Sequence, residues 1–267
     1  MVKRMSCLAS NEASQVRLLV GVLVSGKKRN LVMFAQTLKQ HFVVMGADVD
    51  VTIGGDRFEV DARNTGRSEV FQIRLPEDGS VTAKVLDSDW RRRHLLLGVS
   101  HRRFGVSQKY LCGHDEFHWF VAALPEKTKA ATVPEAMEAL KPQAVLTEQR
   151  RKRVRRHRRG NRRTMAYVRQ GEWFFVPCLD FDADRHPVAH NSTLVRGQGK
   201  PHHVEMLCRR QDGETYVRGK VWHPDHRTVY LDAWHKVLRN TEIVPKDPVA
   251  EKEAEQREAL FLMKYSD

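Results

Sequence analysis

Short runs in which apolar and polar residues alternate, each closed by a turn sequence, recur along most of this chain. Residues 49–53 (VDVTI) alternate up to a Gly-Gly-Asp turn at 54–56, and residues 58–60 continue the pattern. A period of two is typical of β-strands with one buried face, and Gly- and Asp-rich turns between such runs are typical of hairpins. Further runs are EVFQIRL, VTAKVL, VSQKYLC, FHWFVAAL, GEWFFVPCL, HVEMLCRR, TYVRGKVWH and TVYLDAWHKVL. We therefore expect mostly antiparallel sheets, with 49–60 and 69–86 forming two hairpins of a four-strand meander.

A few segments have helical spacing instead. Apolar residues recur every three or four positions at Leu31, Phe34, Ala35, Leu38 and Phe42, ahead of a Gly that could end a helix. A short helix is also expected at EAMEAL, because a Pro lies just before it, where a missing N–H costs nothing. The charged residues 251–262 predict a third helix near the end of the chain.

Together these patterns predict an α+β fold: two mostly antiparallel β lobes with a few short helices, joined by an Arg-rich segment. We expect residues 1–142 to form an α+β N-terminal lobe and residues 143–164 an Arg-rich linker or helix. Residues 165–245 should form a β-rich C-terminal lobe, and residues 246–267 a charged helical tail.

The positive charge of the chain is concentrated in one place. The 267 residues include 46 Lys+Arg and 33 Asp+Glu, a formal net charge of +13. Residues 150–169 hold eleven Lys or Arg and no Asp or Glu, so the other 247 positions carry only 35 basic and 33 acidic residues. This distribution excludes a uniformly basic, histone-like protein and predicts a nearly neutral body with one cationic segment.

Cysteine usage and hydropathy predict the compartment. The four cysteines, Cys7, Cys112, Cys178 and Cys208, lie far apart, which suits neither a disulfide scaffold nor a zinc ribbon. The longest apolar run, residues 18–24, is too short to span a bilayer, and the start of the sequence lacks the apolar region of a signal peptide. We expect a soluble protein of the cytoplasm or another reducing intracellular compartment, without a membrane contact.

The Arg-rich segment predicts a nucleic-acid partner. Arg outnumbers Lys ten to one in residues 150–169, and the planar guanidinium group binds phosphate in a bidentate manner and stacks on bases. If about half of these side chains contacted phosphates, the affinity should fall with salt with a log–log slope of roughly −5. The alternatives are a solvated linker, an import signal, or a basic surface that binds an acidic protein.

A smaller basic cluster could extend this surface. Residues 90–94 (WRRRH) and 101–104 (HRRF) place Arg beside Trp and Phe, a pairing that proteins use to stack the bases of single strands. The alternative without a binding role is a strand with charged ends. The candidate nucleic-acid-binding residues are Arg150, Arg151, Lys152, Arg153, Arg155, Arg156, Arg158, Arg159, Arg162 and Arg163, with Arg91, Arg92, Arg93, Arg102 and Arg103.

The second β-rich region contains side chains that could bind a metal. Seven His occur within fifty residues, and Asp180, Asp182 and Asp184 occupy every second position. His223 and His226 flank a hairpin turn, where they could ligate a transition metal, whereas the carboxylates suit Mg²⁺ or Ca²⁺. No complete nuclease motif accompanies these residues. The candidate ligands are Asp180, Asp182, His190, His202, His203, His223 and His226.

The sequence therefore favours a non-enzymatic protein that binds nucleic acid, RNA in preference to DNA. RNA is favoured because Arg-rich segments suit distorted or single-stranded RNA, and because no helix-turn-helix, zinc finger or heptad repeat is visible. The alternative is a metal-dependent nuclease or phosphodiesterase that uses the His- and Asp-rich C-terminal lobe. No cofactor is expected except a divalent metal under that alternative, and the sequence identifies neither catalytic residues nor protein partners.

Overall fold

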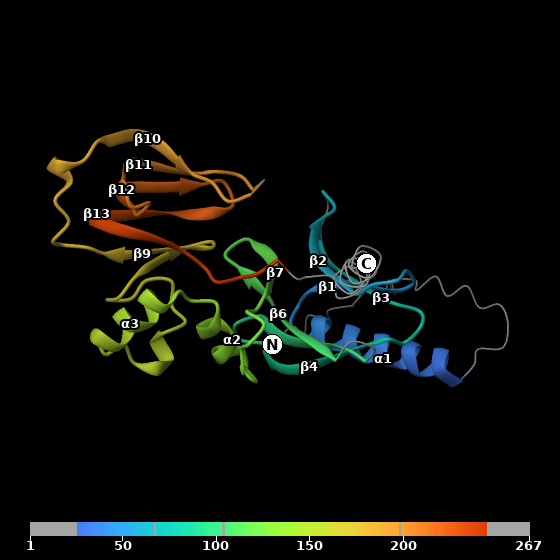
Figure 1. Cartoon of the computed structure of the whole chain (residues 1–267). Coiled ribbons are helices and arrows are strands. Elements are labelled where there is room, and N and C mark those ends of the chain that lie inside the picture. Colours follow the sequence, from blue (N-terminus) through green and yellow to red (C-terminus); the bar gives the residue numbers. More distant parts are fainter. Residues whose placement is uncertain (1–25, 67, 103–104, 198, 245–267) are drawn as a thin grey trace, which may run out of the picture.

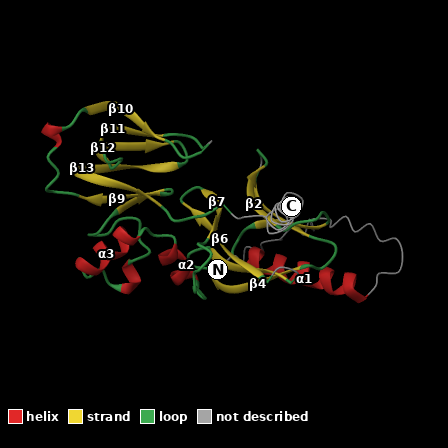
Figure 2. Cartoon of the chain, in the orientation of Figure 1, coloured by secondary structure: helices red, strands yellow, loops and turns green. Residues whose placement is uncertain are grey.

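The computed structural model describes residues 26–66, 68–102, 105–197 and 199–244. Within these ranges the chain forms three sheets of mostly antiparallel strands and three α-helices (Figures 1 and 2). The predicted α+β class is confirmed at this level. The apolar run at 18–24 and the predicted charged tail at 246–267 lie outside the described residues. Among the described helices, none is long and apolar enough to cross a membrane.

The first sheet has three strands in the order β1-β3-β2, and helix α1 (Gly26–Val44) packs against β1. Strands β1 (Asp48–Ile53) and β2 (Glu59–Asn64) were predicted to pair as a hairpin, which is wrong. β3 (Glu69–Leu75) lies between them, parallel to β1 and antiparallel to β2. The physical reason is burial: β3 is the most apolar of the three strands, so it takes the central position that is covered on both edges.

The second sheet has four strands in the order β4-β5-β6-β7. Its strands are β4 (Val81–Asp89), β5 (His94–His101), β6 (Val106–Asp115) and β7 (His118–Ala123). The predicted pairing of 69–75 with 81–86 is wrong, because β4 pairs with β5 rather than with β3, so the four-strand meander does not form. The predicted hairpin of 106–112 with 117–124 is confirmed, since β6 and β7 are antiparallel neighbours.

Strand β5 separates two cores of the N-terminal half. Leu95 and Leu97 belong to one buried cluster, which also contains Leu38 and Phe42 of α1. Leu96 faces the other side and packs in a cluster with residues of helix α2 (Val133–Ala139), because successive side chains of a strand point to opposite faces. The helix predicted at this position is confirmed, and the Thr132 and Glu135 side chains form its capping box.

The third sheet has six antiparallel strands in the order β10-β11-β12-β13-β9-β8. Their bounds are β8 (Val168–Gln170), β9 (Trp173–Pro177), β10 (Val188–Leu194), β11 (His202–Arg209), β12 (Thr215–His223) and β13 (His226–Arg239), with a 3₁₀ turn η2 (Ala183–Arg185) before β10. Val168 and Leu194 of the two edge strands share one buried cluster, so the sheet curls around a common core. Trp222 is 42% exposed, because it faces the side of β12 opposite to this core.

Candidate nucleic-acid interface and histidine cluster

The Arg-rich segment is a short helix followed by two turns. Helix α3 (Gln143–Arg151) ends at its first pair of arginines, and Arg153 adopts a left-handed backbone conformation with φ of 50°. Val154 then turns inward and is buried in a cluster with Val145 of α3 and Phe174 of β9. A 3₁₀ turn, η1 (Arg156–Arg158), follows. One apolar side chain thus fixes the middle of the basic segment to the six-stranded sheet.

The carbonyl oxygen of Arg159 is a second anchor. It accepts hydrogen bonds from the Lys141 ammonium at 2.7 Å and from the Tyr167 hydroxyl at 2.6 Å, with a longer contact of 3.5 Å from the Gln149 amide. Lys141, Gln149 and Tyr167 are all buried, and burial raises the pKa of the Tyr167 hydroxyl. Tyr167 also donates to the carbonyl of Asn161 at 2.9 Å. Buried polar groups therefore hold the backbone of the Arg-rich segment in place.

Five of the predicted cationic side chains line one groove of about 530 Å³. We call it the basic groove; its cations are Lys152, Arg153, Arg155, Arg158 and Arg163. Its other lining residues are Val154, Asn161, Thr164 and Met165, so no carboxylate of the described residues lines it. None of the five cations pairs with a carboxylate in the part of the chain that the structure describes; Arg163 donates to the Tyr230 carbonyl at 2.9 Å. Because positive charge is concentrated there, the groove favours polyanions.

The remaining arginines of the segment have partners elsewhere. Arg150 donates to the carbonyl of Leu146, and Arg151 pairs with Glu148 at 2.7 Å. Arg162 points toward the four-stranded sheet and pairs with both Asp115 and Glu116. Arg156 and Arg159 line a smaller hollow of about 180 Å³ together with Arg92, Glu135 and Glu138. The two basic regions therefore meet at this hollow, where carboxylates are present.

The smaller basic cluster is largely occupied by internal contacts. Arg92 pairs with Asp89, and Arg93 lies 4.3 Å from the ring centre of Trp119 and contacts the Gly46 carbonyl at 3.3 Å. Arg102 donates to the Thr82 hydroxyl at 3.2 Å. Arg91 lies over the exposed Trp90 ring, 5.3 Å from its centre. Arg103 lies outside the described residues.

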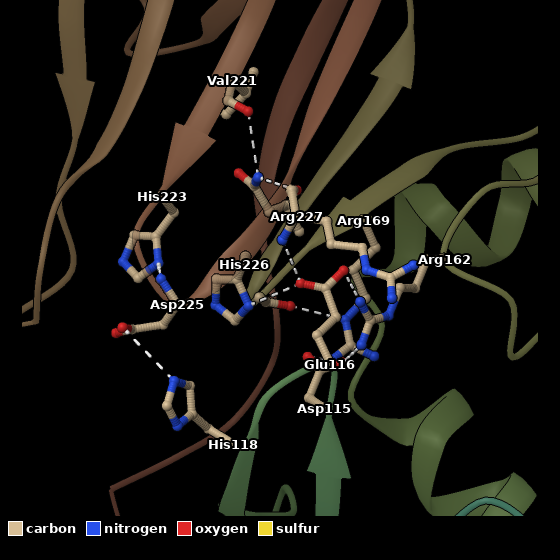
Figure 3. A network of polar contacts seen from close by, with 12 residues as sticks. Asp115, Glu116, His118, Arg162, Arg169, Val221, His223, Asp225, His226 and Arg227 are labelled. Atoms are coloured by element: carbon tan, nitrogen blue, oxygen red, sulfur yellow. Dashed lines mark hydrogen bonds and ion pairs between the residues drawn. The ribbon is translucent and has the colours of Figure 1, made fainter.

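A network of charged side chains joins the β6–β7 turn to the six-stranded sheet (Figure 3). Asp115 accepts from Arg169 at 3.1 Å, and Glu116 accepts from the backbone N–H of Arg227 at 2.6 Å. Asp225 of the β12–β13 turn lies 3.7 Å from the His118 ring, and its carboxylate also pairs with Lys200 at 2.9 Å. A cavity of about 310 Å³ lies beside this network between the four- and six-stranded sheets.

Three of the predicted metal-ligand candidates come together on adjacent strands of the six-stranded sheet. His223 and His226 are paired across the β12–β13 turn, and His203 pairs with Trp222. The same register places His202 opposite His223. One potential ligand atom of each of His202, His223 and His226 lies within 4.8 Å of the other two. We call these three residues the histidine cluster.

The histidine cluster is largely shielded from solvent, because His202 and His223 are buried and His226 is half-buried. Burial, together with the neighbouring imidazoles, lowers the pKa of His202 to about 3. Burial lowers the pKa of His226 to about 4. Both nitrogens of the His202 ring lack a hydrogen-bond partner within the described chain, as does Nδ1 of His226. At neutral pH the His202 and His226 rings thus offer imidazole nitrogens rather than positive charge.

The other metal-ligand candidates lie apart from the histidine cluster. His203 follows His202 directly but faces the opposite side of β11, where its ring packs 5.1 Å from that of Trp222. His190 is exposed on β10. Asp180 and Asp182 are exposed in the loop before β10, and Asp182 pairs with Arg185 at 2.8 Å. The described residues contain no other group of three or more His, Cys, Asp or Glu placed to share an ion.

Sequence reasoning missed the residues that shape the basic groove. Lys141, Gln149 and Tyr167 lie outside any cationic or aromatic motif, and only their burial against one carbonyl shows their role. The absence of Gly and Pro from 144–159 was compatible with a helix through this stretch, but it held no signal for the turn at Arg153.

Comparisons with protein-family models, curated proteins and solved structures found no match for this chain.

Proposed function

We propose that this chain binds nucleic acid, RNA in preference to DNA, by holding backbone phosphates in the basic groove. The observation that carries the proposal is that five cationic side chains line one groove without a carboxylate among them. In this proposal the chain has two β lobes joined by the Arg-rich segment, which presents the groove at the surface. Arg156, Arg159 and Arg92 extend the phosphate track toward the smaller hollow.

The form of the groove supports RNA as the ligand. Its cations come from the end of a nine-residue helix, an irregular turn and a 3₁₀ turn, rather than from one face of a long helix. A regular major groove is read by an element of regular shape, whereas single-stranded and distorted RNA is bound by irregular basic surfaces. Met165 is 74% exposed at the edge of the groove, where it offers an apolar contact to a base or ribose.

Binding is tested with labelled single-stranded RNA, double-stranded RNA and double-stranded DNA in fluorescence-polarisation titrations. We expect the single-stranded RNA to bind most tightly. Replacing Arg153, Arg155 and Arg158 with Gln should weaken its binding about 100-fold, because each lost phosphate contact costs about 1 kcal/mol. The thermal midpoint should not change, because these side chains are exposed and unpaired.

A matched control removes the same charge from other surfaces. Lys84, Lys127 and Arg218 are exposed and lie outside the groove. Their replacement with Gln should change the affinity less than threefold. If both triple variants lost affinity equally, net charge rather than the groove would carry the binding. Recovery of intact RNA after long incubation, with or without chelator, separates binding from the nuclease alternative.

A further inference from the structure

The histidine cluster has unsatisfied hydrogen-bonding capacity in a buried place. His202 is 2% exposed, His223 is 6% exposed, and both His202 ring nitrogens lack a hydrogen-bond partner within the described chain. A buried polar group without a partner costs free energy, and such groups in native proteins usually have a ligand, an ion or a water to satisfy them. The cluster therefore requires an explanation beyond packing.

The contacts of His223 are those of a ligand oriented by its surroundings. Its Nε2–H donates to the carbonyl of Lys200 at 3.3 Å, which leaves Nδ1 as the nitrogen with a lone pair. Metal-binding histidines commonly donate their second N–H to a carbonyl or carboxylate in this way. Nδ1 accepts a bond from the backbone N–H of Asp225 at 3.1 Å, which an ion would replace.

The backbone at Gly171 also lies close to two rings of the histidine cluster. A Cβ added to Gly171 would lie 2.6 Å from Nε2 of His226 and 3.4 Å from Nε2 of His202, so both ring edges face the same backbone segment. Gly171 also has φ of 56°, a conformation in which a side chain is strained. Gly171, which directly follows β8, is thus glycine for two reasons, and it leaves room for the two imidazole rings.

We propose that His202, His223 and His226 bind one divalent transition-metal ion, of which Zn²⁺ is the expected species. Three imidazole ligands suit Zn²⁺ and its neighbours rather than Mg²⁺ or Ca²⁺, which take oxygen ligands. Tetrahedral Zn–N bonds of about 2.05 Å place ligand nitrogens about 3.3 Å apart. The three rings are stacked, with interplanar angles of 23° to 30°. Because an imidazole lone pair lies in the ring plane, the rings must turn, and the nitrogens now within 4.8 Å of one another must close by up to about 1.5 Å, for three of them to converge on one ion.

The site lies where the two halves of the chain meet. His226 lines the 310 Å³ cavity, so an exchangeable fourth ligand reaches the ion from there. Glu116 of the β6–β7 turn lies 3.5 Å from Nδ1 of His226, but its carboxylate is already held by Arg162 and by the Arg227 N–H. A bound ion would fix β11 against the β12–β13 turn and, through His226, support the contact with Glu116 (Figure 3).

The test is metal titration of the untagged full chain after treatment with chelator. We expect calorimetry with Zn²⁺ to give one site with a Kd below about 1 μM at pH 7.5, well short of the affinity of closed four-ligand structural sites. Co²⁺ should give the intense visible absorption of tetrahedral coordination, and Mg²⁺ should not bind. The thermal midpoint should rise by several degrees with Zn²⁺, because the ion binds the folded state.

Two variants of the proposed ligands and a control variant of a neighbouring histidine test where the ion binds. His202→Ala and His223→Gln should each weaken Zn²⁺ binding at least about 100-fold, because each removes one of three ligands. His203→Ala removes the next histidine, on the other face of β11, and should leave the affinity unchanged. Circular dichroism establishes that each variant is folded.

The proposal is overturned if the wild-type chain binds neither Zn²⁺ nor Co²⁺ below about 100 μM, a result that needs no variant. It is equally overturned if the folded His202 and His223 variants bind Zn²⁺ as tightly as the wild type, because the ion would then lie on other histidines. RNA affinity of the metal-free protein is measured in parallel. Its retention shows that failure at this site leaves the proposed nucleic-acid binding untouched.

Discussion

The two basic regions of this molecule have similar sequences and different surroundings. In the cluster at 91–102, Arg92 is paired with Asp89 and Arg93 lies over Trp119. In the basic groove, five cations converge with no carboxylate among the lining residues. A high density of arginine in a sequence therefore does not show that the side chains are available to a ligand. Their availability depends on whether the fold supplies internal partners for the guanidinium groups.

The largest effect is expected from replacing Arg162, and it should differ in kind from the effect of replacing its neighbour Arg163. Arg162→Gln should lower the free energy of unfolding by about 2 kcal/mol, because the half-buried Asp115 and Glu116 lose a charged partner. Its RNA affinity should change little. Arg163→Gln is the matched control: it should keep the stability and lower the affinity. Urea unfolding and polarisation titrations measure both quantities, and equal behaviour of the two variants would contradict the distinction.

The next prediction introduces an acid into the groove. Met165→Glu places a carboxylate at an exposed lining position, so it should weaken RNA binding about tenfold without loss of stability. Met165→Gln has the same shape without the charge and should lose less than threefold. If the two variants lost affinity equally, the apolar contact of Met165 would matter rather than the absence of acid.

A smaller effect is expected when the backbone of the groove is loosened without removing a cation. Tyr167→Phe deletes the hydroxyl that donates to the carbonyls of Arg159 and Asn161. We expect a loss of about 1 kcal/mol in stability and a severalfold loss in RNA affinity. Tyr110→Phe, whose hydroxyl has no hydrogen bond within the described chain, should change neither quantity.

Acid should destabilise the folded chain near the smaller basic cluster. Burial lowers the pKa of His94, whose ring contacts the Arg92 carbonyl at 2.5 Å. The unfolded chain therefore takes up the proton first, so the stability that His94 contributes is complete above about pH 6.5 and falls as the pH is lowered. The slope for one histidine cannot exceed about 1.4 kcal/mol per pH unit. Unfolding curves at pH 7.5 and 5.5 should differ less in His94→Gln than in the wild type.

The smallest effect is expected when an arginine of the smaller basic cluster loses its internal carboxylate partner. Asp89→Asn keeps the oxygen that accepts from the Arg92 N–H but removes the charge that pairs with its guanidinium group. RNA affinity should then rise, by up to about threefold, since an exposed ion pair is weak. A fall in affinity would contradict the proposal that Arg92 extends the phosphate track.

The sequence was sufficient where local pattern decides structure. Alternation and turn residues located the β6–β7 hairpin and the strands around QDGE and PDHR, and the Pro-containing cap located α2. It failed for β1, β2 and β3, because strand order depends on which strand is most deeply covered rather than on proximity along the chain. Within the histidine cluster, the turn predicted the His223–His226 pair. The choice of His202 over His203 depends on the register of β11, which a list of histidines does not contain.

The most direct test of the groove is the salt dependence of single-stranded RNA binding by the wild type and by the variant with Arg153, Arg155 and Arg158 replaced by Gln. With one phosphate contact each, the five cations of the basic groove contribute about −3.5 to the log–log slope of the wild type. Removal of three contacts predicts a slope flatter by about 2. Parallel lines for the two proteins would contradict the account, because the phosphates would then be bound elsewhere on the molecule.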